Sequence, residues 1–226
     1  MTTPSFKFVL ALVAQVLALD AQAGSLTLSC PSASSTSFSE RKHIAALAPG
    51  VVQRMVKHTL QVKAGGKTLK FVDAPPYDEP LDGVRYTFCD RREGFILLTH
   101  TDADRFGGKL IIEATGEVLP AGESVMFSPD RRAYFADVQP DGLDGMEWFI
   151  HGVDGRLSWK GYSFLKHPHK EGWMTATLAD PQFDAKGQFS AQATCIQSDK
   201  ISWKVTLVKQ GGVWDWRPIR KCPDSD

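Results

Sequence analysis

Residues 127–135 read FSPDRRAYF, and this stretch has two relatives in the same chain, FCDRREGF at 88–95 and FDAKGQF at 183–189. The three segments share the pattern Asp-x-Arg/Lys-x-x-Phe, which begins at Asp90, Asp130 and Asp184. Aspartate readily forms polar turns, and an aromatic residue just after a turn suits the first core-facing position of a strand. The pattern therefore predicts three turns, each leading into a β-strand.

A glycine-containing hairpin follows each predicted turn at a nearly constant distance. The hairpin glycines Gly116, Gly155 and Gly212 lie 26, 25 and 28 residues after the three aspartates. A similar hairpin around Gly65-Gly66 precedes the first turn. Glycine adopts the positive φ that tight hairpins need, so each hairpin adds two more strands. The spacing thus predicts modules of four short strands.

The turn Phe127-Ser128-Pro129-Asp130 resembles the FSPDG turn of WD40-like and related β-propeller repeats. The resemblance covers about residues 85–217 in three modules, although Arg131 stands where those repeats have glycine. It implies an all-β, propeller-like array of three to four four-stranded modules. The hairpin at 58–72 and a strand near 25–30 would contribute to a fourth module. An irregular β-sandwich is the alternative.

The remaining segment with helical character is residues 39–57, which Pro49-Gly50 interrupts.

Composition excludes several classes of function. The chain of 226 residues has 26 basic and 26 acidic side chains, so its formal net charge is zero. A nucleic-acid-binding protein or a polybasic membrane-surface protein needs an excess of positive charge. With 42% hydrophobic residues, the chain is also unlike a disordered protein.

Residues 1–23 have the pattern of a secretory signal peptide. Lys7 precedes a short apolar run at 8–19, and Ala21-Gln22-Ala23 matches a cleavage site. The run is shorter than the ~20 apolar residues that cross a membrane, so no transmembrane segment is expected. The prediction is a single mature domain at 24–226 in the periplasm or outside the cell.

Four cysteines fit such an oxidising compartment. No two of them are spaced as in a CxxC motif, which disfavours redox or zinc chemistry. Four cysteines allow three pairings, and we favour pairing between sequence neighbours. The expected disulfides are Cys30–Cys89 and Cys195–Cys222.

Three long connections would open on the same side of a propeller-like array, namely 73–83, 137–145 and 161–173. Insertions gathered on one side of a repeat fold often form its binding surface. The first connection is acidic and stiffened by proline, and the last contains two histidines but no third metal ligand. The candidate partner-binding residues are Tyr77, Asp78, Glu79, Asp82, His167 and His169.

The middle connection begins like a calcium loop, because oxygen donors at positions one, three and five precede a glycine. Pro140 stiffens this turn, and the later acids each miss the usual position by one. An ordinary Asp-Gly turn is the main interpretation, so no cofactor is expected. In the alternative with calcium, the ligands would be Asp137, Gln139, Asp141, Asp144 and Glu147.

No motif for catalysis is present in the sequence: it lacks GxSxG, HExxH, a Walker loop and GxGxxG. We therefore expect a non-enzymatic binding protein. Similarity to propeller-like scaffolds of the bacterial periplasm implies an inhibitor or immunity protein against a basic cell-wall hydrolase. An envelope assembly protein and a calcium-dependent hydrolase are the alternatives.

The neutral net charge could conceal a separation of charge. Paired arginines recur in the predicted turns at 91–92 and 131–132, whereas the long connections are acidic. The sequence therefore predicts a basic end and an acidic end.

Overall fold

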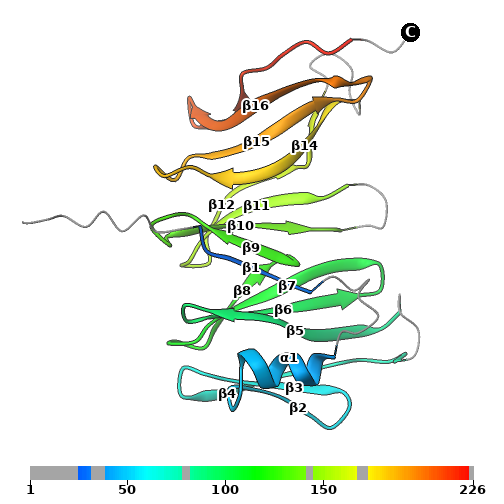
Figure 1. Cartoon of the computed structure of the whole chain (residues 1–226), viewed down its shortest axis with the longest axis vertical. Helices are drawn as coiled ribbons and strands as arrows, with labels where there is room; N and C mark the ends of the chain where they lie inside the picture. The colour runs from blue at the N-terminus through cyan, green and yellow to red at the C-terminus, as the bar shows by residue number, and fades with distance from the viewer. Residues whose placement is uncertain (1–24, 32–38, 78–81, 141–144, 167–172, 224–226) are drawn as a thin grey trace, which may run out of the picture.

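The computed structural model describes residues 25–31, 39–77, 82–140, 145–166 and 173–223, which form four antiparallel β-sheets and one helix. Figure 1 shows the sheets stacked along the longest axis of the molecule, in the order of the chain. The predicted signal peptide at 1–23 lies outside the described residues.

The first sheet has three strands and is accompanied by the helix. Its elements are α1 (Glu40–Leu47), β2 (Val52–Met55), β3 (Thr59–Ala64) and β4 (Lys67–Val72). Helix α1 occupies the first part of the predicted helical segment and ends before Pro49-Gly50, where Gly50 has a φ of 73°.

The next three sheets each contain a four-stranded meander, as the repeat predicts. The second sheet consists of β5 (Val84–Arg92), β6 (Phe95–Asp102), β7 (Arg105–Ile112) and β8 (Glu117–Ala121). The third consists of β9 (Ser124–Phe127), β10 (Ala133–Val138), β11 (Glu147–Gly152) and β12 (Leu157–Tyr162), with β1 (Thr27–Ser29) paired to β9. The fourth consists of β14 (Met174–Phe183), β15 (Phe189–Cys195), β16 (Ser198–Gln210) and β17 (Val213–Arg217), with β13 (Phe164–Lys166) paired to β14.

Asp130 and Asp184 form the predicted turns between the first and second strands of the third and fourth sheets, whereas Asp90 lies within β5 and the turn there is formed by Glu93-Gly94. The Asp130 carboxylate accepts hydrogen bonds from the Ser128 hydroxyl and the Arg132 backbone N–H, at 2.7 and 3.1 Å. Asp184 accepts backbone N–H bonds from Lys186 and Gln188, both at 2.8 Å. Such local bonds stabilise a turn at the expense of regular strand, which explains why the strands break here.

A hydrophobic core fills each space between neighbouring sheets. The core between the third and fourth sheets is the most aromatic, and Trp148, Trp159, Trp203 and Trp216 are all buried in it. Leu60 and Phe88 lie in the core between the first and second sheets, and Leu28 and Tyr134 in that between the second and third.

The outer faces of the two terminal sheets are polar. On the fourth sheet, side chains opposite the core side include the cross-strand pairs Thr194–Ser202 and Gln192–Lys204. On the first sheet, Gln61 and Lys63 alternate with the buried Leu60 and Val62. These two sheets lie at opposite ends of the stack in Figure 1. The described residues thus form an open, all-β array, and no ring brings the first and last sheets together.

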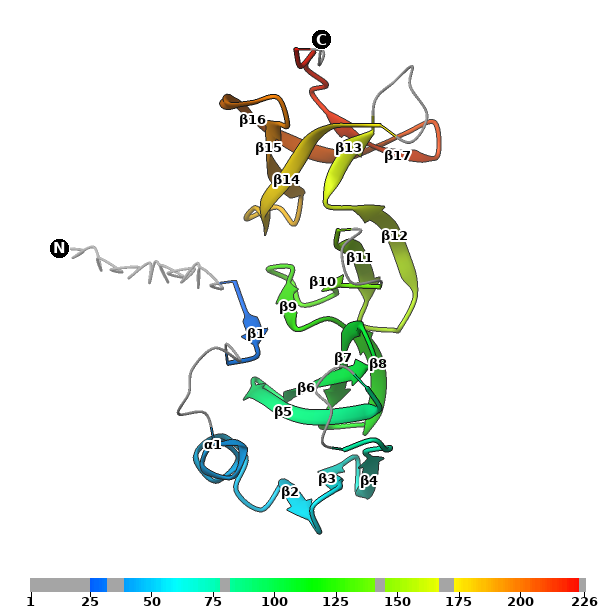
Figure 2. The ribbon, with the colours of Figure 1, turned by 90° about the vertical axis from the view of Figure 1, so that its right-hand side faces the viewer.

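The first strand of each meander lies along one edge of the stack, and the last strand along the other. In Figure 2, β5, β9 and β14 lie to the left and β8, β12 and β17 to the right. Short strands cover β9 and β14, whereas β5 makes only the isolated bridge between Val84 and Ala74 along this edge in the part of the chain that the structure describes. Side chains from the first sheet and α1 take the place of a strand along β5. Its backbone bonds to Asp73, Arg54, Glu40 and His43.

Two disulfides are present, and both pair sequence neighbours as predicted. Cys30–Cys89 joins the segment after β1 to β5, and so connects the third sheet to the second. Cys195–Cys222 joins β15 to the segment after β17. Two disulfides in one chain indicate an oxidising, extracytoplasmic environment. None of the described helices is long and apolar enough to cross a membrane.

Candidate functional site

The space between the second and third sheets changes character along its length. At the end that carries the turns at 93–94, 113–116 and 128–132, which we call the turn end, it is filled by the core around Leu97, Leu110 and Tyr134. Toward the opposite end, where the long connections lie and which we call the loop end, the facing side chains become polar and a cleft opens. The cleft continues past the edge of β5 to Arg54, His58 and Tyr77, and its total volume is about 1090 Å³. This volume is slightly above the usual range of small-molecule sites.

One wall of the cleft is the loop-end half of β5 and β6. Arg85 and Thr87 alternate along β5 on the same side as Cys89, because successive strand residues point to opposite faces. Their cross-strand partners on β6 are Thr101 and Thr99, which also line the cleft. This wall therefore presents one guanidinium group among three hydroxyl groups. We call it the Arg85 wall.

The other wall comes from the link between β8 and β9 and from the end of β10, and we call it the Glu123 wall. Glu123 and Ser124 follow directly after Gly122, and Asp137 lies across from Ser124. The Ser124 hydroxyl donates a hydrogen bond to Asp137 Oδ1 at 3.2 Å. Within the described chain, no cation lies within ion-pair distance of Glu123 or Asp137.

The two carboxyl groups of the Glu123 wall have raised pKa values. Partial withdrawal from water raises the pKa of Glu123, and repulsion by Asp137 raises it further, although part of the side chain remains accessible. Burial also raises the pKa of Asp137, and the bond from Ser124 partly opposes this rise. Both groups would be stabilised in their charged form by a cation placed in the cleft.

Close backbone packing positions Glu123. A Cβ atom on Gly122 would lie 1.7 Å from the Asp137 carbonyl oxygen, and one on Gly108 would lie 2.1 Å from the Gly122 carbonyl oxygen. Only glycine allows the short β8–β9 link to lie this close to β7 and β10. The link therefore places Glu123 near Asp137.

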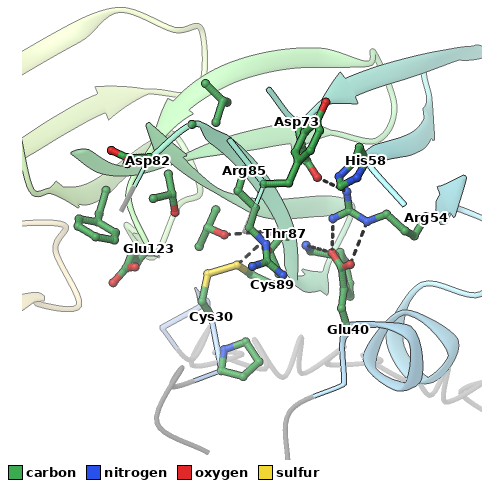
Figure 3. A pocket seen from close by; sticks show the side chains of 18 of the residues that line it. Cys30, Glu40, Arg54, His58, Asp73, Asp82, Arg85, Thr87, Cys89 and Glu123 are labelled. Carbon is green, nitrogen blue, oxygen red and sulfur yellow. Dashed lines mark hydrogen bonds and ion pairs between the residues drawn. A yellow bond between two sulfur atoms is a disulfide. The ribbon is translucent and has the colours of Figure 1, made fainter. Parts of the chain in front are cut away.

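The disulfide Cys30–Cys89 lines the cleft and links its two walls covalently. Figure 3 shows the disulfide with Arg85 and Thr87 near it and Glu123 well to one side. Because Cys89 belongs to β5 and Cys30 follows β1, the bond limits how far the two sheets can separate.

On the other side of the pocket in Figure 3, Arg54 connects the first sheet to the second. Its guanidinium group donates to both oxygens of Glu40, at 2.8 and 3.0 Å, and to Asp73 at 3.2 Å. The same two acids accept backbone N–H bonds from Phe88 and Tyr86. All three side chains are thus engaged within the protein, so we assign this network a structural role.

The arginines at the turn end are neutralised locally. Each pairs with an acid at the same end, and the pairs are Arg91–Glu113, Arg92–Asp90, Arg131–Glu93, Arg132–Asp130 and Arg156–Asp154. The predicted basic end is therefore wrong, because acids of the same and of neighbouring turns compensate the charge of the arginines. Charge without a partner is found instead in the cleft.

The structure describes two of the six predicted partner-binding residues. Tyr77 and Asp82 both line the cleft, and the Tyr77 ring stacks on His58 with a centroid distance of 3.7 Å. The other four, Asp78, Glu79, His167 and His169, lie outside the described residues.

The alternative calcium ligands are not gathered into one site where the structure describes them. Asp137 pairs across the sheet with Trp148, and Glu147 with Val138, so the two acids point to opposite faces. Glu147 forms an ion pair with Lys160 at 2.7 Å, and the Gln139 backbone pairs with Phe106. Asp141 and Asp144 lie outside the described residues, and no group of three potential metal ligands occurs among those described.

Sequence reasoning missed the Arg85 wall and Glu123, whereas it had named Asp137 as an alternative calcium ligand. A signal for the Arg85 wall existed, because polar residues alternate at 85, 87, 99 and 101 where a buried strand would carry apolar ones. No comparable signal marks Glu123, since its place depends on how the link after Gly122 packs.

Comparison with known proteins gives no relative: no protein-family model, no curated protein and no solved structure matches this chain.

Proposed function

We propose that this protein is a secreted or periplasmic binding protein without enzymatic activity, and that it receives part of a protein partner in the cleft at the loop end. The two disulfides support a location outside the cytoplasm. The four-stranded meanders support a relationship to propeller blades, arranged here as an open array.

The contrast between the two ends of the molecule carries this proposal. At the turn end, five arginines pair with neighbouring acids. In the cleft, Asp82, Glu123 and Asp137 have no ion-pair partner among the described residues. Charged groups that face a cleft without a partner are available to a ligand.

The partner class that fits best is a basic cell-wall hydrolase, which makes the protein an inhibitor or immunity protein. Three free carboxylates complement a basic surface, and such complementarity mainly increases the rate of association. Tyr77 is 47% exposed at the same cleft, and tyrosine is a frequent anchor in interfaces.

Binding to a basic lysozyme-type hydrolase tests this function. We would measure affinity by calorimetry and inhibition by the lysis of cell walls, at 50 and 300 mM salt. We expect binding that weakens at the higher salt concentration and that falls at least tenfold in the double variant Asp82→Asn/Glu123→Gln. Asp199→Asn, which removes an exposed acid of β16 far along the stack, is the matched control and should bind normally.

Two results would count against the proposal. Equal affinity of the double variant and the wild type would exclude the cleft as the binding site. Stable binding without loss of hydrolase activity would instead favour the alternative role of an envelope assembly protein.

A further inference from the structure

The cleft has walls of opposite charge. The Arg85 wall contributes a guanidinium group and three hydroxyl groups, and the Glu123 wall contributes two carboxyl groups. Within the described chain, none of these charged groups has an ion-pair partner. Figure 3 shows Arg85 and Glu123 well separated, so the cleft lies between them.

We propose that the cleft binds a zwitterionic ligand, a short free peptide, with its ammonium group at Glu123 and Asp137 and its carboxylate at Arg85. This inference rests on the proposed function in that it uses the same cleft, and it specifies the chemistry that the cleft recognises.

The arrangement fits such a ligand better than it fits an ion of one sign. A free anion would be attracted by Arg85 and repelled by the two acids, and a free cation would experience the reverse. A dipolar ligand places each of its charges beside the complementary wall. The hydroxyl groups of Thr87, Thr99 and Thr101 can bond the peptide groups between the charges.

Other charged groups that line the cleft do not compete for the same role. Arg54, Glu40 and Asp73 are bonded to one another, and His58 is stacked on Tyr77. Lys57 belongs to the turn between β2 and β3 of the first sheet, next to that network. Asp82 also lines the cleft, and Figure 3 shows it on the same side of Arg85 as Glu123, so it adds negative charge to that side.

Triglycine is a suitable probe, because its two ends can be blocked separately. We would titrate the mature protein with triglycine, N-acetyl-triglycine and triglycine amide, following chemical shifts and heat. Triglycine should saturate the cleft, and each blocked peptide should bind at least tenfold more weakly.

Two variants assign the ends of the peptide to the walls. Arg85→Gln should weaken triglycine at least tenfold and leave triglycine amide unchanged. Glu123→Gln should weaken triglycine in the same way and leave the N-acetyl form unchanged. Arg156→Gln at the turn end is the control and should not alter any affinity; unfolding temperatures would verify that all variants fold.

Failure of triglycine to bind, or equal binding of all three peptides, would overturn this inference. The result is separable from the proposed function. A hydrolase that binds the cleft while triglycine does not would leave the binding role intact, and triglycine binding without hydrolase binding would leave only the zwitterion site.

Discussion

Gly122 shows how one residue without a side chain determines the cleft. The short link after β8 fits against β10 only because no Cβ is present, and the link carries Glu123. The same crowding affects Gly108 on the other side of the link, whereas Gly107 has its nearest neighbour at an ordinary 3.6 Å.

Gly122→Ala should therefore lower the free energy of unfolding by about 3 kcal/mol, since backbone atoms must shift to accept the methyl group. Urea unfolding monitored by tryptophan fluorescence would measure this loss. Gly107→Ala is the matched control and should change stability by less than about 0.5 kcal/mol. Equal effects of the two substitutions would contradict the packing argument.

His151 predicts how stability depends on pH. Its side chain is buried against Tyr134, with a ring-centroid distance of 5.4 Å, and its Nδ1 has no hydrogen-bond partner. Burial lowers the pKa of His151 in the folded protein, so the unfolded chain binds the proton more readily. The free energy of unfolding is therefore not reduced by His151 above the ordinary histidine pKa, and it declines as the pH falls below that value.

His151→Phe should consequently remove part of the acid destabilisation. We expect similar free energies of unfolding for wild type and variant at pH 7.5, and a more stable variant at pH 5. Glu123 and Asp137 have raised pKa values and act in the opposite direction, but they are the same in both proteins. Denaturant unfolding at the two pH values checks this, and parallel pH profiles would refute it.

At the scale of elements, β5 is an edge strand protected by side chains. Arg54 holds Glu40 and Asp73 in position, and these acids accept backbone N–H groups of β5. Exposed strand edges invite unwanted pairing with other chains, so covering the edge matters for solubility as well as stability.

Arg54→Met should lower the free energy of unfolding by about 3 kcal/mol, because it leaves the buried Asp73 and the largely buried Glu40 without their cation. The Arg54 and Glu40 side chains are 18% and 21% exposed, so water screens this network only partly. Arg156→Met breaks the ion pair with Asp154, whose side chains are 88% and 59% exposed. This variant should have almost the same free energy of unfolding as the wild type. The unfolding temperatures of the two variants would be compared. If Arg54→Met unfolds at the same temperature as the wild type, the edge of β5 needs no cation.

The sequence predicts elements better than it predicts their contacts. The Asp-x-Arg/Lys turns and the Gly hairpins are local, so their four-stranded meanders follow from the residues within each module. The disulfide pairing between sequence neighbours, favoured among three possible pairings, is also confirmed. Ring closure, by contrast, requires the first and last sheets to pack on each other through apolar outer faces. The short resemblance to a propeller turn contains no information on the polarity of those faces. The pairing of turn arginines with Glu93 and Glu113 likewise joins separate turns, and Glu113 lies outside the repeat.

At the scale of the whole molecule, Cys30–Cys89 is the covalent connection across the cleft. Its sequence separation of 59 residues exceeds the 27 of Cys195–Cys222. The chain-entropy model gives about 4 kcal/mol for the longer loop and somewhat less for the shorter one.

Cys30→Ser/Cys89→Ser should lower stability by about that amount and also weaken triglycine binding, since the walls are no longer joined. Cys195→Ser/Cys222→Ser should lower stability but leave triglycine binding unchanged in the folded protein. Unfolding temperatures and peptide titrations distinguish the two roles. Equal effects of both double variants on binding would show that the first disulfide does not maintain the cleft.

The polar outer faces of the terminal sheets have a consequence for growth of the array. Apolar end faces would let one molecule stack on the next and propagate into fibres, as uncapped repeat arrays do. Here Lys204 and Gln192 at one end, and Gln61 and Lys63 at the other, favour water over another sheet. The array therefore ends with the sheets of a single molecule. We expect concentrated solutions of the protein to remain free of end-to-end filaments.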